Sequence, residues 1–317
     1  MIAGAPRDLR EGGRWTPLQR AKNDVLYVAA TTSLALAVRL PARWLRALGR
    51  TVGVVAHAVA PGLRRLARAN VARAYPGLEP GARDALVARA YARLGEHLGE
   101  AVASLAPSRP AAPLAFAEGA RETLEEAIAE GRGVVFASAH LGPWERVAET
   151  LTAAGLPFTA VAREAYDPRL DAIYARLRAA RGVRTIYRGR PGAAAAMLRT
   201  LRGRGVLGIP MDLASRVPSV DVPFLGVPAR TPVGPARLAL RVGAAVVVGT
   251  AAPGPGGRLV LVAERIPTGD LAGRPRDQAA ARELTARLSA ALSERIRAMP
   301  DAWPWMHPRW GDAGAAV

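Results

Sequence analysis

Cysteine is absent from this 317-residue chain, and Lys22 is its only lysine. Without cysteine the chain can form no disulfide, no thiolate zinc site and no cysteine acyl-enzyme. Its four histidines are scattered without metal-ligand spacing, and neither a phosphate-binding loop nor a dinucleotide-binding glycine pattern is present. We therefore expect no metal and no cofactor. Aromatic residues make up only 5% of the chain, which leaves few platforms on which single-stranded nucleic acid could stack.

Positive charge is abundant and unevenly distributed. The net charge is +18, and residues 1–75 contain 13 basic against 3 acidic side chains. Such an excess predicts an anionic partner, which could be an acidic membrane surface, an acidic substrate or nucleic acid. One hypothesis is a non-catalytic basic protein that binds membranes or nucleic acid, with affinity for polyanions and no turnover.

The basic N-terminal region also contains apolar runs, at residues 25–38 and 51–60. A helix over the first run would be about 21 Å long, which is shorter than the roughly 30 Å hydrocarbon core of a bilayer. We interpret residues 1–60 as a membrane-associating segment whose basic side chains meet anionic headgroups. The alternative is an ordinary hydrophobic helix packed in the core.

The remaining chain divides into a helical lead-in at residues 61–113, an α/β core at 114–312 and a tail at 313–317. A helix is predicted at 80–106, and the Pro-rich stretch 107–113 is a boundary. In the core, apolar runs predict strands at 133–139, 156–162, 183–187, 205–211, 244–251 and 258–266. Intervening segments predict helices at 120–131, 143–154, 168–181, 191–203 and 276–299. This alternation predicts an α/β fold with a mixed, largely parallel sheet flanked by helices.

His140 follows the first of these predicted strands, with Pro143 and Glu145 just beyond it. Sites in open α/β sheets form at the carboxyl ends of strands, so His140 is a candidate general base. In the first turn of the next helix, Glu145 could accept a hydrogen bond from one ring nitrogen and leave the other free to take a proton. The alternative is a buried structural histidine, since a His-x4-Glu pair is common by chance.

Three further polar residues are candidates for substrate binding. Arg163 follows the strand 156–162 and Asp212 follows the strand 205–211, so both emerge at the same sheet edge as His140. Arg230 lies in a Pro- and Gly-rich stretch that is interpreted as a substrate-positioning loop, with Thr231 as the N-cap of the next helix. The alternatives are surface arginines and a turn carboxylate.

The C-terminal stretch "WPWMHPRW" holds three tryptophans close together. It could be a catalytic aromatic box, but packing against the sheet or at the membrane boundary is favoured for Trp303, Trp305 and Trp310. The remaining histidines are interpreted as structural or surface residues: His57, His97 and His307.

Four blocks of the sequence resemble the bacterial lipid A biosynthesis acyltransferases of the lysophospholipid acyltransferase superfamily. They are "NVARAYPGLEP" (70–80), "GVVFASAHLGPWE" (133–145), the segment 211–251 and "IRAMPDAWPWMHPRWGD" (296–312), in the order of the family. Family members often have Asp-Gln where this chain has Asp212 and Leu213, which puts in doubt any side-chain role for the second position. The resemblance implies a glycerol-3-phosphate acyltransferase-like fold.

The resemblance also implies a reaction, the transfer of a fatty acyl chain from a thioester to a hydroxyl of a lipid A precursor. The donor it implies is acyl carrier protein, with acyl-coenzyme A as the alternative. Other possible acceptors are a lysophospholipid or another glycolipid such as a phosphatidylinositol mannoside. It places the protein at the cytoplasmic face of the inner membrane, with a lipid acceptor and no nucleic acid. General-base catalysis by His140 without a covalent acyl-enzyme suits this reaction.

Overall fold

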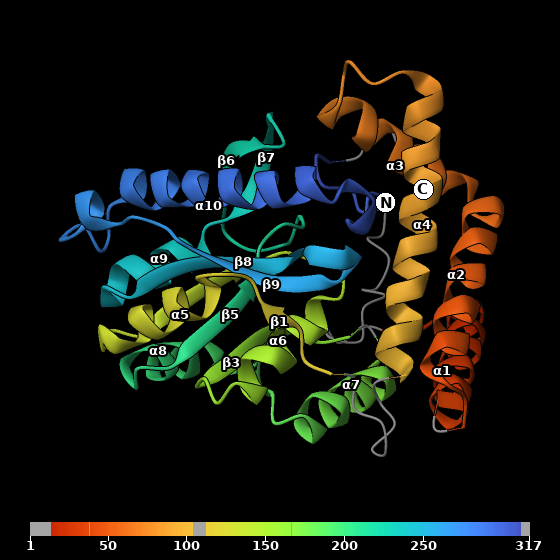
Figure 1. Ribbon diagram of the computed structural model, residues 1–317, viewed down its shortest axis with the longest axis horizontal. Helices are drawn as coiled ribbons and strands as arrows, with labels where there is room; N and C mark the ends of the chain where they lie inside the picture. Colours follow the sequence, from red (N-terminus) through yellow and green to blue (C-terminus); the bar gives the residue numbers. More distant parts are fainter. Residues whose placement is uncertain (1–13, 38, 104–111, 166, 312–317) are drawn as a thin grey trace.

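Four helices form the N-terminal part of the structure, a computed structural model that describes residues 14–37, 39–103, 112–165 and 167–311. They are α1 (Pro17–Ala37), α2 (Ala42–Val59), α3 (Pro61–Ala74) and α4 (Pro80–Ala103). Figure 1 shows α1 and α2 stacked beside α4 at one end of the molecule, with α4 between them and the α/β body. Residues 1–13 of the predicted membrane-associating segment, most of the boundary at 107–113 and the tail at 313–317 lie outside the described residues.

Glycines bring α2 and α4 into backbone contact. A Cβ atom on Gly49 would lie 2.2 Å from the carbonyl oxygen of Gly95, and one on Gly99 would lie 2.1 Å from that of Leu45. No side chain fits at such distances, so these positions require glycine. The predicted apolar segment around residues 51–60 is thereby fixed to the rest of the fold along one face of α2.

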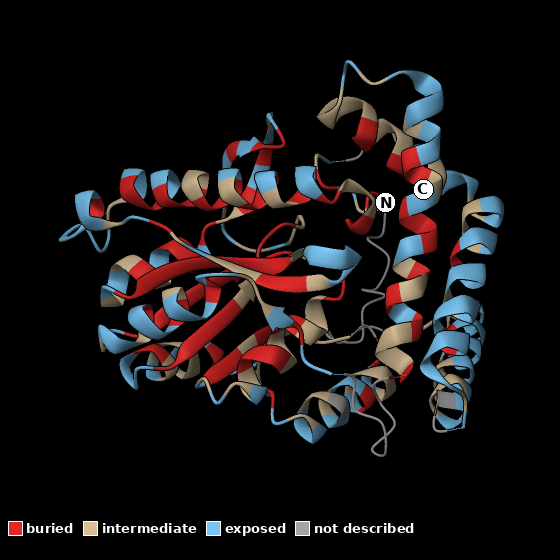
Figure 2. Cartoon of the chain, viewed as in Figure 1, coloured by how far each residue is buried: buried red, intermediate tan, exposed pale blue. Residues whose placement is uncertain are grey.

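A neighbouring face of α2 is apolar and open to solvent. Five side chains repeat at helical spacing along it and are 50–72% exposed. We call this set the α2 apolar face: Trp44, Leu48, Val52, Val55 and Val59. Figure 2 shows that α1 and α2 are mostly exposed, whereas the central strands of the sheet are mostly buried. None of the helices in the described part of the chain combines the length and the hydrophobicity that spanning a bilayer requires.

A seven-stranded sheet forms the centre of the α/β body, in the order β1-β9-β8-β2-β5-β3-β4. Its strands are β1 (Ala115–Phe116), β2 (Val134–Ser138), β3 (Phe158–Arg163), β4 (Arg184–Arg188), β5 (Val206–Pro210), β8 (Ala245–Pro253) and β9 (Leu259–Arg265). Every neighbouring pair is parallel except β8 and β9. This confirms the predicted mixed, largely parallel sheet.

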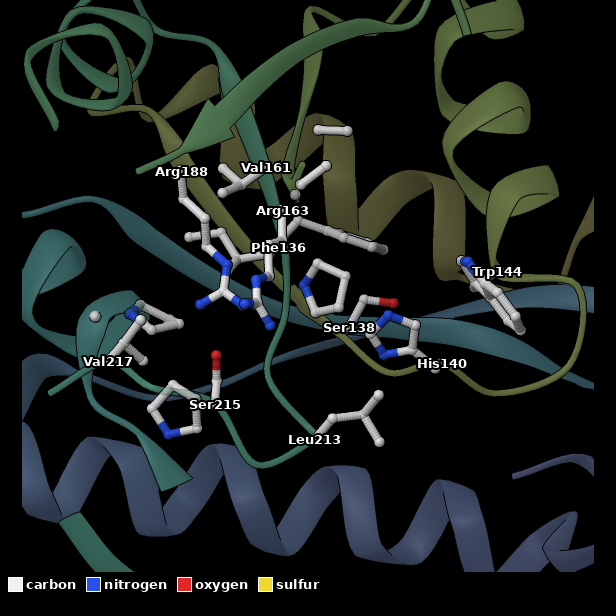
Figure 3. A pocket seen from close by; sticks show the side chains of 18 of the residues that line it. Phe136, Ser138, His140, Trp144, Val161, Arg163, Arg188, Leu213, Ser215 and Val217 are labelled. Carbon is white, nitrogen blue, oxygen red and sulfur yellow. The ribbon is translucent and has the colours of Figure 1, made fainter. Parts of the chain in front are cut away.

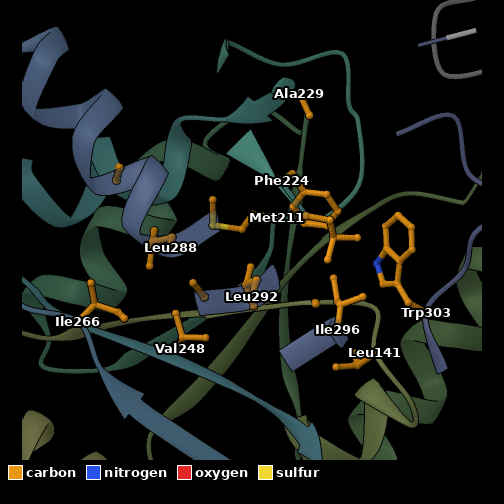
Figure 4. Packing of buried hydrophobic residues seen from close by; sticks show 14 of the residues in the cluster. Leu141, Met211, Phe224, Ala229, Val248, Ile266, Leu288, Leu292, Ile296 and Trp303 are labelled. Atoms are coloured by element: carbon orange, nitrogen blue, oxygen red, sulfur yellow. The ribbon is translucent and has the colours of Figure 1, made fainter. Parts of the chain in front are cut away.

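Helices cover both faces of the sheet, so its central strands β2, β5 and β8 are apolar at nearly every position. In β2, Val135 and Ala137 face one core with α9 (Gly234–Val242) and α10 (Gln278–Ala298). Val134 and Phe136 face the other core with α5 (Ala120–Ala129) and α6 (Trp144–Ala153). Two further helices, α7 (Pro168–Ala180) and α8 (Ala193–Arg202), flank β4. Figure 4 shows the first core, where α10 packs on the sheet.

The stretch interpreted as a substrate-positioning loop is instead a β-hairpin. Strands β6 (Ser219–Phe224) and β7 (Val227–Pro232) pair antiparallel and pack on α10. The predicted N-cap at Thr231 is wrong, because α9 begins at Gly234 and the Thr231 hydroxyl accepts a hydrogen bond from Arg309 Nη2 at 2.7 Å. The hairpin therefore holds the C-terminal segment through Arg309 and packs on α10.

Candidate active site

The register of the sheet brings His140 and Asp212 together. Strands β2 and β5 are parallel neighbours, and Ser138 is aligned with Pro210. His140 and Asp212 each follow their strand by two residues, so continuation of the register places them opposite each other at the carboxyl edge. Sites in open α/β sheets form at this edge.

Asp212 holds the imidazole of His140 in one orientation. Its Oδ1 lies 2.9 Å from His140 Nδ1, and its Oδ2 accepts hydrogen bonds from the His140 backbone N–H at 3.0 Å and from Trp303 Nε1 at 2.8 Å. The carboxylate is fully buried, so these donors replace the water that it loses. When Nδ1 carries the proton that bonds Asp212, Nε2 is left as a proton acceptor.

The two groups perturb each other's pKa in opposite directions. Burial alone would lower the pKa of His140, but the charge of Asp212 and its hydrogen bond outweigh burial and raise that pKa above 6.5. Burial would raise the pKa of Asp212, but the charge of His140, the hydrogen bond to His140 and the hydrogen bond from Trp303 hold it below the ordinary value of 3.8. Asp212 therefore stays ionised and favours a proton on His140.

Glu145 does not orient His140 as the sequence analysis expected. Its carboxylate pairs instead with Arg178 of α7, with Oε1 2.6 Å from Nη2 and Oε2 3.1 Å from Nε. The Gly142–Pro143 turn starts α6 at Trp144, and Gly142 has a φ of +60° with its N–H bonded to the Ala302 carbonyl. As a result Asp212, and not Glu145, bonds the imidazole of His140. Glu145 affects that ring only through its charge, which raises the pKa of His140.

A cavity of about 560 Å³ opens beside His140 at the carboxyl edge. It is lined by apolar side chains and by a few polar ones, and 31% of the His140 side chain is exposed. Figure 3 shows His140 and Trp144 on one side, with Arg163 and Arg188 pointing into the same space. Arg163 therefore lies at the same sheet edge as His140, as predicted from the strand that precedes it. Arg188 is a second arginine at this edge, and the sequence analysis did not identify it.

A second cavity, of about 480 Å³, lies between α1, α4, α6 and α7. Its walls are mainly apolar and include Leu26 of α1, Leu98 of α4 and Ile173 of α7. The two cavities share three lining residues, which are Trp144, Glu145 and Arg178. The Glu145–Arg178 ion pair therefore stands at the boundary between the cavity that contains His140 and the more apolar second cavity.

Arg230 is not part of the cavity. Its side chain is exposed on β7, and its backbone carbonyl accepts a hydrogen bond from Arg309 Nη1 at 2.6 Å. Its side chain alternates away from the buried face of the hairpin, so the structure does not bring Arg230 together with His140, and its contact with substrate stays a prediction. The fully buried Arg309, whose guanidinium lies 4.3 Å from the Phe224 ring centre, was not singled out from the sequence.

The C-terminal tryptophans pack next to the candidate site, and one of them bonds Asp212. Trp303 and Trp305 are buried with ring centres 4.8 Å apart, and Trp303 reaches Asp212. These tryptophans pack inside the protein, as favoured from the sequence, and one of them also orients the carboxylate. His307, interpreted as structural, lines the cavity beside His140. Among the described residues no cluster of three metal-ligating side chains occurs.

The fold and the site together define a class of protein. A cavity at the carboxyl edge of a mostly parallel sheet, with a histidine held by a buried carboxylate, is the arrangement of an enzyme that removes a proton from a bound substrate. The chain belongs to the bacterial lipid A biosynthesis acyltransferase family, which it matches over residues 18–312. The resemblance noted in the sequence is therefore confirmed.

Two curated relatives carry a more specific name. They are phosphatidylinositol mannoside acyltransferases of Mycobacterium tuberculosis, from strains CDC 1551 and H37Rv. Each is 29% identical over 196 residues, which cover 61% of this chain and 59% of the relative. The aligned segment thus spans well under two thirds of each relative.

Proposed function

We propose that this protein is an O-acyltransferase that moves a fatty acyl chain from a thioester to a hydroxyl of a glycolipid. The observation that carries the proposal is the His140–Asp212 pair at the mouth of the cavity, with Nδ1 2.9 Å from Oδ1. Membership of an acyltransferase family supplies the reaction class.

In the proposed mechanism, His140 Nε2 takes the proton from the acceptor hydroxyl as its oxygen attacks the thioester carbonyl. An alcohol is a weak nucleophile at neutral pH, so this proton transfer is required. Asp212 stabilises the imidazolium that forms. The tetrahedral intermediate then collapses, the C–S bond breaks, and the imidazolium returns its proton to the departing thiolate. The N-terminus of α6, which begins at Trp144 in the wall of the cavity, supplies favourable polarity for the oxyanion.

The two cavities suit the two halves of this reaction. The cavity beside His140 contains arginines and receives the acceptor headgroup. The cavity under α1 receives the acyl chain, because most of the surface that its walls expose is apolar. Acyl carrier protein, with its acidic surface, is the proposed donor for a chain with a net charge of +18.

The proposed location is the cytoplasmic face of the inner membrane. The α2 apolar face exposes five side chains, and a neighbouring face of the same helix is locked to α4. Exposed basic residues of the same region, Arg39, Arg43 and Arg46, are available to anionic headgroups. We propose that this helix lies in the headgroup region and brings the cavity to its lipid acceptor.

A product assay tests the proposed function. Purified protein is incubated with acyl carrier protein and coenzyme A thioesters of several chain lengths, each with a lipid A precursor, a phosphatidylinositol mannoside and a lysophospholipid. Mass spectrometry should show one acylated glycolipid, and the family name favours the first acceptor whereas the two mycobacterial relatives favour the second. The proposal fails if no acceptor gains an acyl chain above the level seen with a His140→Ala control.

A further inference from the structure

The imidazole of His140 is hydrogen-bonded at one ring atom. Its Nδ1 lies 2.9 Å from Asp212 Oδ1, and in the described part of the chain no other side chain bonds the ring. The side chain is 31% exposed, so the ring borders the open space of the cavity. A ring bonded at one nitrogen can still turn or swing toward that space, whereas a general base needs its accepting nitrogen in a fixed direction. A second contact is therefore needed to hold the ring.

Trp144 makes that second contact. The ring centres of Trp144 and His140 are 5.4 Å apart, and the ring planes are inclined at 64°. This edge-to-face arrangement is one that aromatic pairs prefer. Figure 3 shows the indole beside the imidazole in the wall of the cavity. Asp212 thus holds the ring at Nδ1, and Trp144 packs against the ring itself.

The backbone fixes the position of the indole. Trp144 is the first residue of α6, and its N–H donates to the Gly142 carbonyl at 3.0 Å. Gly142 in turn donates to the Ala302 carbonyl at 3.0 Å and has a φ of +60°. A Cβ on Gly142 would lie 3.1 Å from Met299 Cε, so this turn packs closely on the C-terminal segment. The indole therefore starts from a fixed helix end.

The ring of Trp144, and not its N–H group, is what the site uses. The indole N–H groups of Trp303 and Trp305 donate to Asp212 and to the Pro300 carbonyl, but in the described part of the chain no such bond holds Trp144. Trp144 also lines both cavities and is only half-buried. Its place at the site is therefore not explained by a hydrogen bond or by burial in the core.

We propose that Trp144 is a positioning residue for the general base, which keeps the His140 imidazole against Asp212 with Nε2 directed into the cavity. The inference rests on the proposed function for the role of His140 as a base. Trp144→Leu removes the aromatic contact and leaves an apolar side chain, whereas Trp144→Phe keeps a ring at the same place. Misorientation of a reacting group is costly, so we expect kcat to fall about 10- to 100-fold in Trp144→Leu and to recover largely in Trp144→Phe.

Nitrogen NMR of the imidazoles tests the inference without requiring turnover. The full-length protein in uncharged detergent micelles contains four histidines, and His140→Ala identifies the signals of His140. At a pH where this imidazole is neutral, the native protein and Trp144→Phe should show one tautomer, with the proton on Nδ1. Trp144→Leu should show an average of both tautomers, because its ring is free to turn. A single Nδ1-protonated tautomer in Trp144→Leu would overturn the inference.

Steady-state kinetics and Tm separate positioning from other roles. Trp144→Leu should lower kcat while KM for donor and acceptor changes less than about threefold, because the indole acts on the base and not on substrate binding. Phe116→Leu, which removes an aromatic ring from β1 at the far side of the sheet, is the control and should turn over normally.

Two outcomes would contradict the positioning role. A raised KM for the thioester with unchanged imidazole signals would show that the indole contacts substrate instead. A fall in kcat that is matched by the unfolded fraction would show a structural tryptophan. An ordered imidazole in a protein that transfers no acyl chain would contradict the proposed function but leave the role of Trp144 in place.

Discussion

The chemistry of the site depends on one fully buried carboxylate. Asp212 accepts hydrogen bonds from the His140 ring, the His140 backbone and the Trp303 indole, and it is completely shielded from solvent. Such a carboxylate stays ionised only because every oxygen is satisfied. Its fixed position determines which imidazole nitrogen faces the substrate cavity, which is the requirement for a general base.

The pH dependence of catalysis should reflect this pair. His140 acts as a base only when neutral, so kcat/KM should rise as the pH passes through its pKa, which lies above 6.5. Asp212→Asn removes the charge that raises that pKa, so the rising limb should move to lower pH while kcat falls about 10²- to 10⁴-fold. A pH–rate profile of both proteins checks this, with Asp221→Asn on the exposed side of β6 as the control. An Asp212→Asn enzyme with the native limb and the native kcat would contradict the pairing.

Glu145 should matter less to the chemical step than Asp212. Because its carboxylate is bonded to Arg178, Glu145→Gln weakens an ion pair between the two cavities and lowers the pKa of His140 only slightly. We expect kcat to fall less than about tenfold, below the range for loss of a general base. Combining it with Arg178→Gln should add little further loss, since the two side chains act together. Steady-state kinetics measures both variants, and a loss from Glu145→Gln as large as that from Asp212→Asn would disprove this division of roles.

Several site residues could be predicted because they directly follow predicted strands. His140, Arg163 and Asp212 each end an apolar run, and the carboxyl edge collects such residues. The carboxylate partner of His140 could not be predicted, because it depends on β2 and β5 being neighbours although 72 residues separate the aligned positions. Local spacing favoured Glu145, and the turn at Gly142 directed it elsewhere.

At the level of elements, the apolar runs and the segments between them were enough to predict that strands and helices alternate in the core. The order of strands was not, since it depends on long-range pairing. The β6–β7 hairpin was not predicted, because prolines at 223, 228 and 232 are typical of a loop. A pair of strands outside a larger sheet tolerates them, since their missing N–H groups need not join a ladder on both sides. Strand β1 is only two residues long, too short to give a pattern.

Helix α2 carries the most specific element-scale expectation. Replacing Leu48 and Val52 with aspartate places two charges on the α2 apolar face, which would have to enter the headgroup region. We expect the variant to lose binding to vesicles that contain anionic lipid, while its circular dichroism spectrum stays native because both side chains are exposed. Vesicle flotation measures binding.

The matched control replaces Glu122 and Glu126, exposed on α5, with glutamine, which should leave vesicle binding intact. Unchanged flotation of the Leu48→Asp/Val52→Asp protein would show that another surface meets the membrane.

For the whole molecule, charge is the dominant property. A net charge of +18 on 317 residues produces a long-range field that attracts acidic partners and is screened by salt. With acyl carrier protein as donor, kcat/KM should fall steeply between low and physiological ionic strength, because charge steering acts mainly on association. The comparison donor is a small uncharged acyl thioester, whose kcat/KM should change little. A flat salt dependence with acyl carrier protein would exclude charge-steered docking.

The central claim is that His140 is the general base of acyl transfer, and His140→Ala tests it most directly. Turnover and Tm are measured together on this variant and on His57→Ala, which removes a histidine far from the cavity. The account predicts that kcat falls about 10²- to 10⁴-fold or more in His140→Ala while its fold persists, and that His57→Ala turns over normally. A purely structural histidine would instead cost about 1–3 kcal/mol of stability through unpaired polar groups. A His140→Ala protein that melts early but keeps near-native turnover at low temperature would contradict the account.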